Sequence, residues 1–144
     1  MNVIVRDDGF HSDEWLEQGG TFIDLEKYGQ DLVEKPKDKT ALDIPNDVEL
    51  DTLSAILGAV DMIRIPFPSF ADGRGFSLAV GLREIGYTGV IRAYGHILAD
   101  QYGSARKCGF DEVEIDEDLA KRQPAEQWLA FLPERTPDYQ RKWL

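Results

Sequence analysis

Residues 70–77, with the sequence Phe-Ala-Asp-Gly-Arg-Gly-Phe-Ser, hold the groups best suited to binding an anion. They stand between a strand-like run and a helix-like run. At such a junction Gly73 and Gly75 would leave backbone N–H groups open beside the guanidinium of Arg74, and the start of a helix carries partial positive charge. The pattern therefore predicts that these three residues bind a small oxyanion such as sulfite, sulfate or phosphate.

A structural role for the same loop stays open. Asp72 would then cap the helix, and Arg74 would pair with a neighbouring carboxylate. Two better-known phosphate motifs do not fit the chain. Position 78 is Leu where a dinucleotide fingerprint needs its third glycine, and the sequence contains no Gly-Lys-Ser/Thr phosphate loop.

Arg92 is the second candidate for binding negative charge. It lies in an apolar, strand-like run, and a buried arginine needs partners because an unpaired buried charge costs several kcal/mol. We expect it either to reach the anion site or, as the favoured reading, to pair structurally with an acid such as Asp72 or Asp100.

Polar side chains also follow the strand that contains Arg92. His96 comes directly after it, where a neutral imidazole could act as a general base or a hydrogen-bond donor. Asp100 and Gln101 lie in the predicted helix that follows and would support the site. Gln101 is expected to face inward, and a buried amide must be hydrogen-bonded, either to loop backbone, which we favour, or to a ligand.

Size and composition limit the classes of function. The chain has 144 residues, 42% of them hydrophobic, which is enough for one domain without disulfides or metals. A single cysteine, two histidines and no Cys-x-x-Cys pair argue against a structural metal site. No stretch predicts a membrane span or a signal peptide, so we expect a cytoplasmic protein that does not bind membranes.

The charge distribution narrows the choice of partners. The net charge is −11, which disfavours nucleic acid. Residues 62–110 nevertheless hold six basic and three acidic side chains, so the rest of the chain carries −14. A locally positive segment fits a small anionic ligand or one complementary protein surface, or it reflects basic residues that cap helices.

The pattern from residue 40 onward predicts alternating strands and helices. The expected strands are 40–44, about 61–66, 90–94 and 113–115, and the expected helices are about 47–58, 76–85, 97–107 and 125–132. Asn46 and Glu49 have the spacing of a capping box for the first helix. This alternation predicts an α/β fold with a parallel sheet built from βαβ units, either an open three-layer sheet or half of a (β/α) barrel. In both architectures, ligands bind at the carboxyl ends of the strands.

The whole chain, 1–144, is expected to form a single domain. Residues 1–39 would be a short β-rich N-terminal extension and linker, residues 40–132 the βαβ core, and residues 133–144 a C-terminal tail.

Several short motifs occur together in the middle third of the chain. They are 70–77, Leu-Arg at 82–83, Gly-Tyr-Thr-Gly at 86–89, Ile-Arg-Ala-Tyr-Gly at 91–95, Asp-Gln at 100–101 and Arg-Lys-Cys-Gly-Phe-Asp at 106–111, with Tyr-Gln at 139–140 near the end. In this combination the segment from about 62 to 115 resembles the bacterial family called domain of unknown function 934. Proteins of this family are often labelled as oxidoreductases involved in sulfite reduction. The chain departs from the family pattern at His96, where an acidic residue is usual.

The resemblance implies a role beside assimilatory sulfite reduction, because such proteins are commonly encoded next to sulfite reductase components. It supplies no demonstrated activity, cofactor or catalytic residue. We therefore predict an accessory protein with no tightly held redox cofactor, which binds sulfite reductase or another sulfur-assimilation protein, a small oxyanion, or both. The alternative is an oxidoreductase or other enzyme that acts on an anionic sulfur metabolite. Arg74 and Arg92 would then hold charge, while His96 or Asp72 moves a proton.

Overall fold

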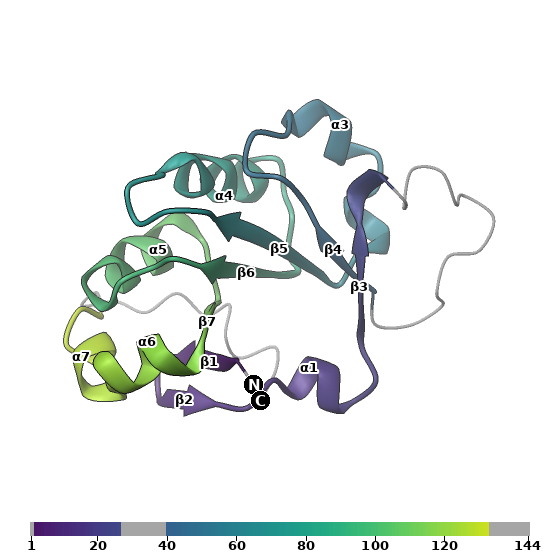
Figure 1. Ribbon diagram of the computed structural model, residues 1–144. Coiled ribbons are helices and arrows are strands. Elements are labelled where there is room, and N and C mark those ends of the chain that lie inside the picture. The colour runs from purple at the N-terminus through teal and green to yellow at the C-terminus, as the bar shows by residue number, and fades with distance from the viewer. Residues whose placement is uncertain (1, 27–39, 133–144) are drawn as a thin grey trace.

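The computed structural model describes residues 2–26 and 40–132, and within them seven strands form one mixed sheet (Figure 1). The order across the sheet is β2-β1-β7-β6-β5-β4-β3. The strands are β1 (Val3–Arg6), β2 (Gly9–His11), β3 (Thr21–Asp24), β4 (Thr40–Asp43), β5 (Met62–Phe67), β6 (Val90–Gly95) and β7 (Glu112–Ile115). The predicted tail and most of the predicted linker lie outside the described residues.

Strands β3 to β7 run parallel, which confirms the predicted βαβ architecture. The β-rich N-terminal extension is confirmed as well, and it adds to both edges of the sheet. Strand β3 pairs with β4 at one edge. At the other edge β1 runs antiparallel to β7, and β2 runs antiparallel to β1.

The helices between the parallel strands cover one face of the sheet (Figure 1). They are α3 (Leu50–Ser54), α4 (Arg74–Glu84) and α5 (Tyr102–Cys108), followed by α6 (Glu117–Arg122) and α7 (Ala125–Leu129) on the same face, with short 3₁₀ turns at Leu57–Ala59 and Ala99–Gln101. Strands β3 to β7 follow the chain order without reversal, and right-handed crossovers place the connections from β4 to β7 on one side of the sheet. This is the winding of half a (β/α) barrel, and the sheet stays open.

The two faces of the sheet have different chemistry because side chains alternate along each strand. Ile63, Ile65 and Ile91 point to the helix face, where they form the main core with residues such as Leu82 and Tyr102. On the opposite face the apolar cluster is small. There Trp15, in helix α1 (Glu14–Glu17), packs on Ala41, Met62 and Val90.

The first predicted helix differs from the structure. Helix α3 begins only at Leu50, and Glu49 at its N-cap makes no side-chain capping bond. The predicted cap Asn46 instead donates from its amide to Asp72 Oδ2 at 3.1 Å. A long-range partner therefore replaces the local capping box. Helix α6, which the sequence pattern did not predict, begins after Asp116, whose carboxylate accepts from the backbone N–H of Leu119 at 2.7 Å.

Candidate functional site

The glycine–arginine loop lies at the start of α4, and its charge is balanced within the loop. Arg74 donates from Nε and Nη2 to Asp72 at 3.0 and 2.8 Å, and its backbone N–H reaches the same carboxylate at 3.2 Å. These hydrogen bonds from Arg74 hold the pKa of Asp72 well below its usual range. Asp72 therefore pairs with Arg74, the structural alternative that the sequence left open. The side chain of Arg74 is still 60% exposed, and anion binding there stays a prediction.

The two glycines of this loop have different surroundings. A Cβ added at Gly75 would lie 2.5 Å from the ring of Phe67, whereas one at Gly73 would meet only Phe76 at 3.9 Å. Gly75 is buried, so its lack of a side chain allows the start of α4 to pack closely on β5. Close packing explains the second glycine without a ligand.

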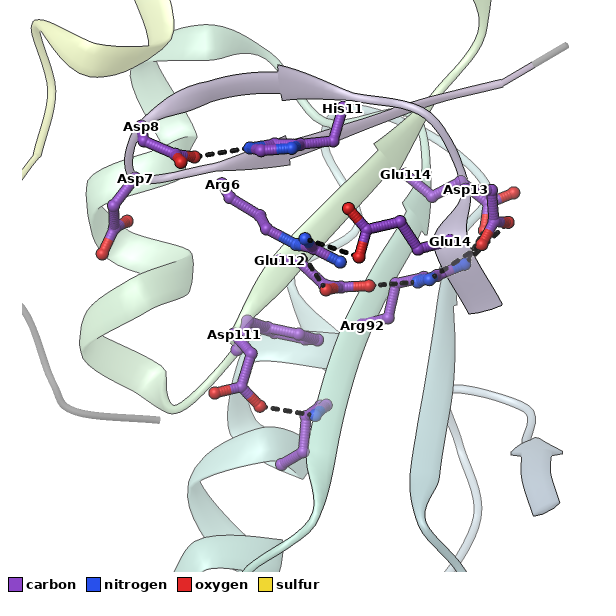
Figure 2. A network of polar contacts seen from close by, with 12 residues as sticks. Arg6, Asp7, Asp8, His11, Asp13, Glu14, Arg92, Asp111, Glu112 and Glu114 are labelled. Atoms are coloured by element: carbon purple, nitrogen blue, oxygen red, sulfur yellow. Dashed lines mark hydrogen bonds and ion pairs between the residues drawn. The ribbon is translucent and has the colours of Figure 1, made fainter. Parts of the chain in front are cut away.

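Arg92 lies on the open face of the sheet (Figure 2), and its hydrogen-bond partners come from outside the glycine–arginine loop. Its side chain is 1% exposed and donates to Glu112 at 2.6 Å, to Glu114 at 3.0 Å and to Asp13 at 3.0 Å. Burial alone would lower the pKa of Arg92, but the carboxylates around it, Glu112 foremost, raise that pKa further above its usual value. Structural pairing was the favoured expectation, but Asp72 and Asp100 are not among these partners. Asp72 lies in the loop before α4, and Asp100 lies in the 3₁₀ turn after β6. Glu112, in contrast, is the register partner of Arg92 on the neighbouring strand β7.

Arg64, which was not predicted as a site residue, extends the same arrangement toward β4. It donates to both carboxylate oxygens of Asp43 at 2.5 and 2.8 Å and to Glu114 at 3.0 Å. Its guanidinium carbon lies 3.7 Å from the ring centre of Phe22 and 4.6 Å from that of Tyr94.

The open face therefore carries a charge ladder, which we define as Asp43, Arg64, Arg92, Glu112 and Glu114. Asp43 pairs in register with Arg64, Arg64 with Arg92, and Arg92 with Glu112. Arg6 adds to its end by donating to Glu112 at 3.1 Å. The signal in the sequence was the alternation Ile-Arg-Ile, Ile-Arg-Ala and Glu-Val-Glu, which puts charged residues on one face of neighbouring strands.

The remaining predicted site residues lie in the loop after β6. His96 is exposed and stacks on Phe70, with ring centroids 5.1 Å apart, while its backbone N–H donates to Phe67 O at 2.9 Å. The Gln101 amide accepts from the Leu98 N–H at 2.8 Å and donates to Phe70 O at 3.0 Å. Gln101 thus binds loop backbone, the favoured expectation. Asp100 is exposed at the surface.

Two hollows on the open face meet at the carboxyl ends of β5 and β6. The first, of about 500 Å³, is lined by Asp24, Leu25, Glu26, Asp43, Ile44, Pro45, Arg64, Pro66 and Tyr94. The second, of about 470 Å³, is lined by Asn2, Pro66, Phe67, Pro68, Tyr94, Gly95, His96, Glu114 and Asp116. Because Pro66 and Tyr94 line both, we treat them as one depression, the carboxyl-edge groove.

The site residues predicted from the sequence are therefore divided between two places. Arg74 and Asp72 form one pair at the start of α4, whereas His96 lines the groove and Arg92 supports its floor through Glu114. Across residues 2–26 and 40–132 no group of His, Cys, Asp and Glu side chains is arranged to hold a metal ion. No helix in that part of the chain is long and apolar enough to cross a bilayer.

Comparison with known proteins identifies a family for most of the chain. The family model described as "Bacterial protein of unknown function (DUF934)" matches residues 41–144, from β4 onward. No curated protein and no solved structure matches the chain significantly.

Proposed function

The chain belongs to the bacterial family DUF934, and from this premise we propose that it is an accessory protein of sulfite reduction that holds a partner protein in the carboxyl-edge groove. The groove itself is the observation that carries the proposal. It lies where parallel α/β sheets bind their ligands, and it opens on the face that the connecting helices leave uncovered. The link to sulfite reduction is supported by the motif resemblance.

Exposed aromatic side chains at the groove favour a protein partner. Tyr94, which lines both hollows, is 38% exposed, and Phe70, stacked on His96 beside the groove, is 40% exposed. Aromatic residues are enriched at the energetically important centres of protein interfaces. Val80 in α4 and Ile85 at its C-cap are also exposed, but they lie on the helix side of the sheet and line neither hollow.

The charges at the groove favour binding over catalysis. The guanidinium of Arg64 is already engaged by Asp43 and Glu114, and that of Arg92 by three carboxylates. An anionic substrate would have to displace these partners, and leaving the buried carboxylates of Glu112 and Glu114 unpaired costs several kcal/mol. The paired arginines therefore serve better as a rigid floor than as substrate clamps.

The test uses the tagged full-length chain and purified sulfite reductase. We expect the chain to retain the reductase on an affinity resin and to show no sulfite-dependent NADPH oxidation when assayed alone. Turnover by the chain alone, or visible absorbance from a flavin that co-purifies with it, would contradict an accessory role. Failure to retain the reductase would remove it as the partner.

A small oxyanion at the glycine–arginine loop is the second candidate, favoured by the exposure of Arg74 at the start of an 11-residue helix. Sulfite titrated into the protein by calorimetry should give binding that Arg74→Ala weakens. The melting temperature should change little, because Arg74 is 60% exposed and Asp72 keeps its hydrogen bonds from Asn46 and from the backbone N–H at position 74. Lys107→Ala, on the surface of α5, is the matched control. Equal binding by both variants would place the anion elsewhere.

A further inference from the structure

We infer that the carboxyl-edge groove takes an extended, positively charged segment of its partner, with a lysine or arginine seated between Asp24, Glu26 and Tyr94. This inference rests on the proposed function, because it names the kind of segment that would occupy the same groove. It follows from the charge, the shape and the side-chain chemistry of the lining.

The charge of the lining is negative. Asp24, Glu26 and Asp43 line one hollow, and Glu114 and Asp116 line the other. The basic lining residues are Arg64 and His96, and both Asp43 and Glu114 pair with the guanidinium of Arg64. Asp24 and Glu26 are exposed at the rim, so their charge faces whatever enters. A cationic segment is attracted to such a rim, and an anionic one is repelled.

The shape of the groove suits a chain segment more than a compact ligand. The two hollows, of about 500 and 470 Å³, are joined at Pro66 and Tyr94. Much of the wall between the charged ends is apolar, with Ile44 and Pro45 at one end and Phe67 and Pro68 at the other. An extended segment could place apolar side chains against these walls and a cation at the acidic end.

The groove already holds one guanidinium in the way proposed for the partner. Arg64 lies between the rings of Phe22 and Tyr94, and Asp43 binds it through both oxygens. Cations placed over aromatic rings gain electrostatic attraction, most of all where water is partly excluded. Tyr94 is still 38% exposed, and Asp24, two residues after Phe22 in β3, is exposed as well. Aromatic and acidic groups therefore remain at the surface for a second cation.

The experiment measures fluorescence anisotropy with the full-length chain and a labelled short peptide that alternates arginine with leucine. The same peptide with glutamate in place of arginine is the reference. We expect only the arginine peptide to bind, and its affinity to fall as salt rises above about 50 mM, because exposed charges are screened. The double variant Asp24→Asn/Glu26→Gln should weaken binding about five- to tenfold.

The matched control is the double variant Glu84→Gln/Asp118→Asn, which removes the same charge from exposed positions on α4 and α6. It should change the affinity less than twofold. Equal loss in both double variants would show that net charge, and not the groove, attracts the peptide, and would overturn the inference. Competition by a free diamine such as cadaverine at the peptide's own concentration would also overturn it, since a compact cation would then suffice.

Peptide binding and retention of the reductase test the further inference and the proposed function separately. If the reductase is retained but neither peptide binds, the groove has a different occupant and this inference is wrong. If the arginine peptide binds at the groove and the reductase is not retained, the groove chemistry stands and the proposed partner is wrong.

Discussion

Arg92, on the open face, forms ion pairs with three carboxylates. It joins β6 to β7 through Glu112 and Glu114, and it joins the sheet to the segment before α1 through Asp13. The last contact crosses 79 positions of the chain, from Arg92 back to Asp13. A position in the middle of a strand predicts burial and the need for partners, but it does not reveal a partner so distant in sequence. That is why the need for pairing could be predicted and the partners could not.

We expect Arg92→Met to destabilise the fold by about 3–5 kcal/mol, because it leaves buried carboxylates without their main partner. The measurement is urea unfolding followed by tryptophan fluorescence. Lys107→Met, an exposed cation on α5, should change stability by no more than about 0.5 kcal/mol. A loss below about 1 kcal/mol for Arg92→Met would mean that Arg6 and Arg64 can hold Glu112 and Glu114 without it.

Asp111, on the helix side of the sheet, should make the stability of the fold depend on pH. Its carboxylate accepts from Arg83 Nη2 and from the Ile91 N–H, both at 2.8 Å, and burial raises the pKa of Asp111 to about 6. The folded state then holds a proton more tightly than the unfolded chain, whose Asp pKa is about 3.9. The stability that this proton contributes is present at low pH and is lost as pH rises through about 6.

The measurement compares the free energy of unfolding of the natural chain and of Asp111→Asn between about pH 4 and pH 7. Asparagine cannot titrate, so the natural chain should lose on the order of 2–3 kcal/mol relative to the variant across this range. A relative gain in stability with rising pH would show that Arg83 favours the ionised carboxylate more than burial opposes it.

At the scale of elements, the junction of β5 and α4 shows how one motif can be explained in two ways. The glycines at 73 and 75 were predicted to expose backbone donors to an anion. The structure gives Gly75 a packing role against Phe67, because no side chain fits between the helix and the strand. The sequence predicts a strand-to-helix junction here correctly, but a glycine needed for a ligand and a glycine needed for packing look the same in sequence.

This difference predicts unequal effects on stability for alanine substitutions at the two glycines. Gly75→Ala should lower stability by about 1–3 kcal/mol, because its Cβ would overlap the Phe67 ring and force α4 to shift. Gly73→Ala should be nearly neutral, since φ there is −90° and the nearest atom lies 3.9 Å away. Thermal unfolding of both variants provides the comparison. Equal destabilisation would mean that both glycines are required by the backbone of the loop.

The elements that were hardest to predict are those with few local signals. Helices α1 and α6 span four and six residues, too short for helical periodicity to be recognised. Asn46 and Glu49 have the spacing of a capping box, but Asn46 donates to Asp72 and does not cap α3. The regular segments β5, α4 and β6 were predicted to within two residues of their bounds, because apolar spacing defines them.

At the scale of the whole molecule, the N-terminal strands complete the sheet at both edges. The family match begins at residue 41, so β1, β2 and β3 lie outside it. This N-terminal part nevertheless contributes to the open face, since Arg6 and Asp13 bind the charge ladder and Asp24 and Glu26 line the groove. The β-rich extension could be predicted from its turns, but its division between the two edges depends on long-range pairing that the local sequence does not encode.

The division of the faces also explains what the groove can do. The connecting helices bury the apolar side of the sheet, while the other side keeps a paired, polar floor that ends in an open rim at the carboxyl ends of the strands. A floor whose charges are already satisfied is rigid, and a rigid floor favours docking because little order must be gained on binding.

The most direct test of this account is retention of purified sulfite reductase by three forms of the chain: natural, Tyr94→Ala and Val80→Ala. Both substitutions remove an exposed apolar side chain of similar exposure, 38% for Tyr94 in the groove and 39% for Val80 on the helix face. We predict that Tyr94→Ala loses at least about tenfold in affinity, as expected for an aromatic contact at an interface centre, and that Val80→Ala binds like the natural chain. Undiminished binding by Tyr94→Ala, or an equal loss in both variants, would contradict the groove as the docking site.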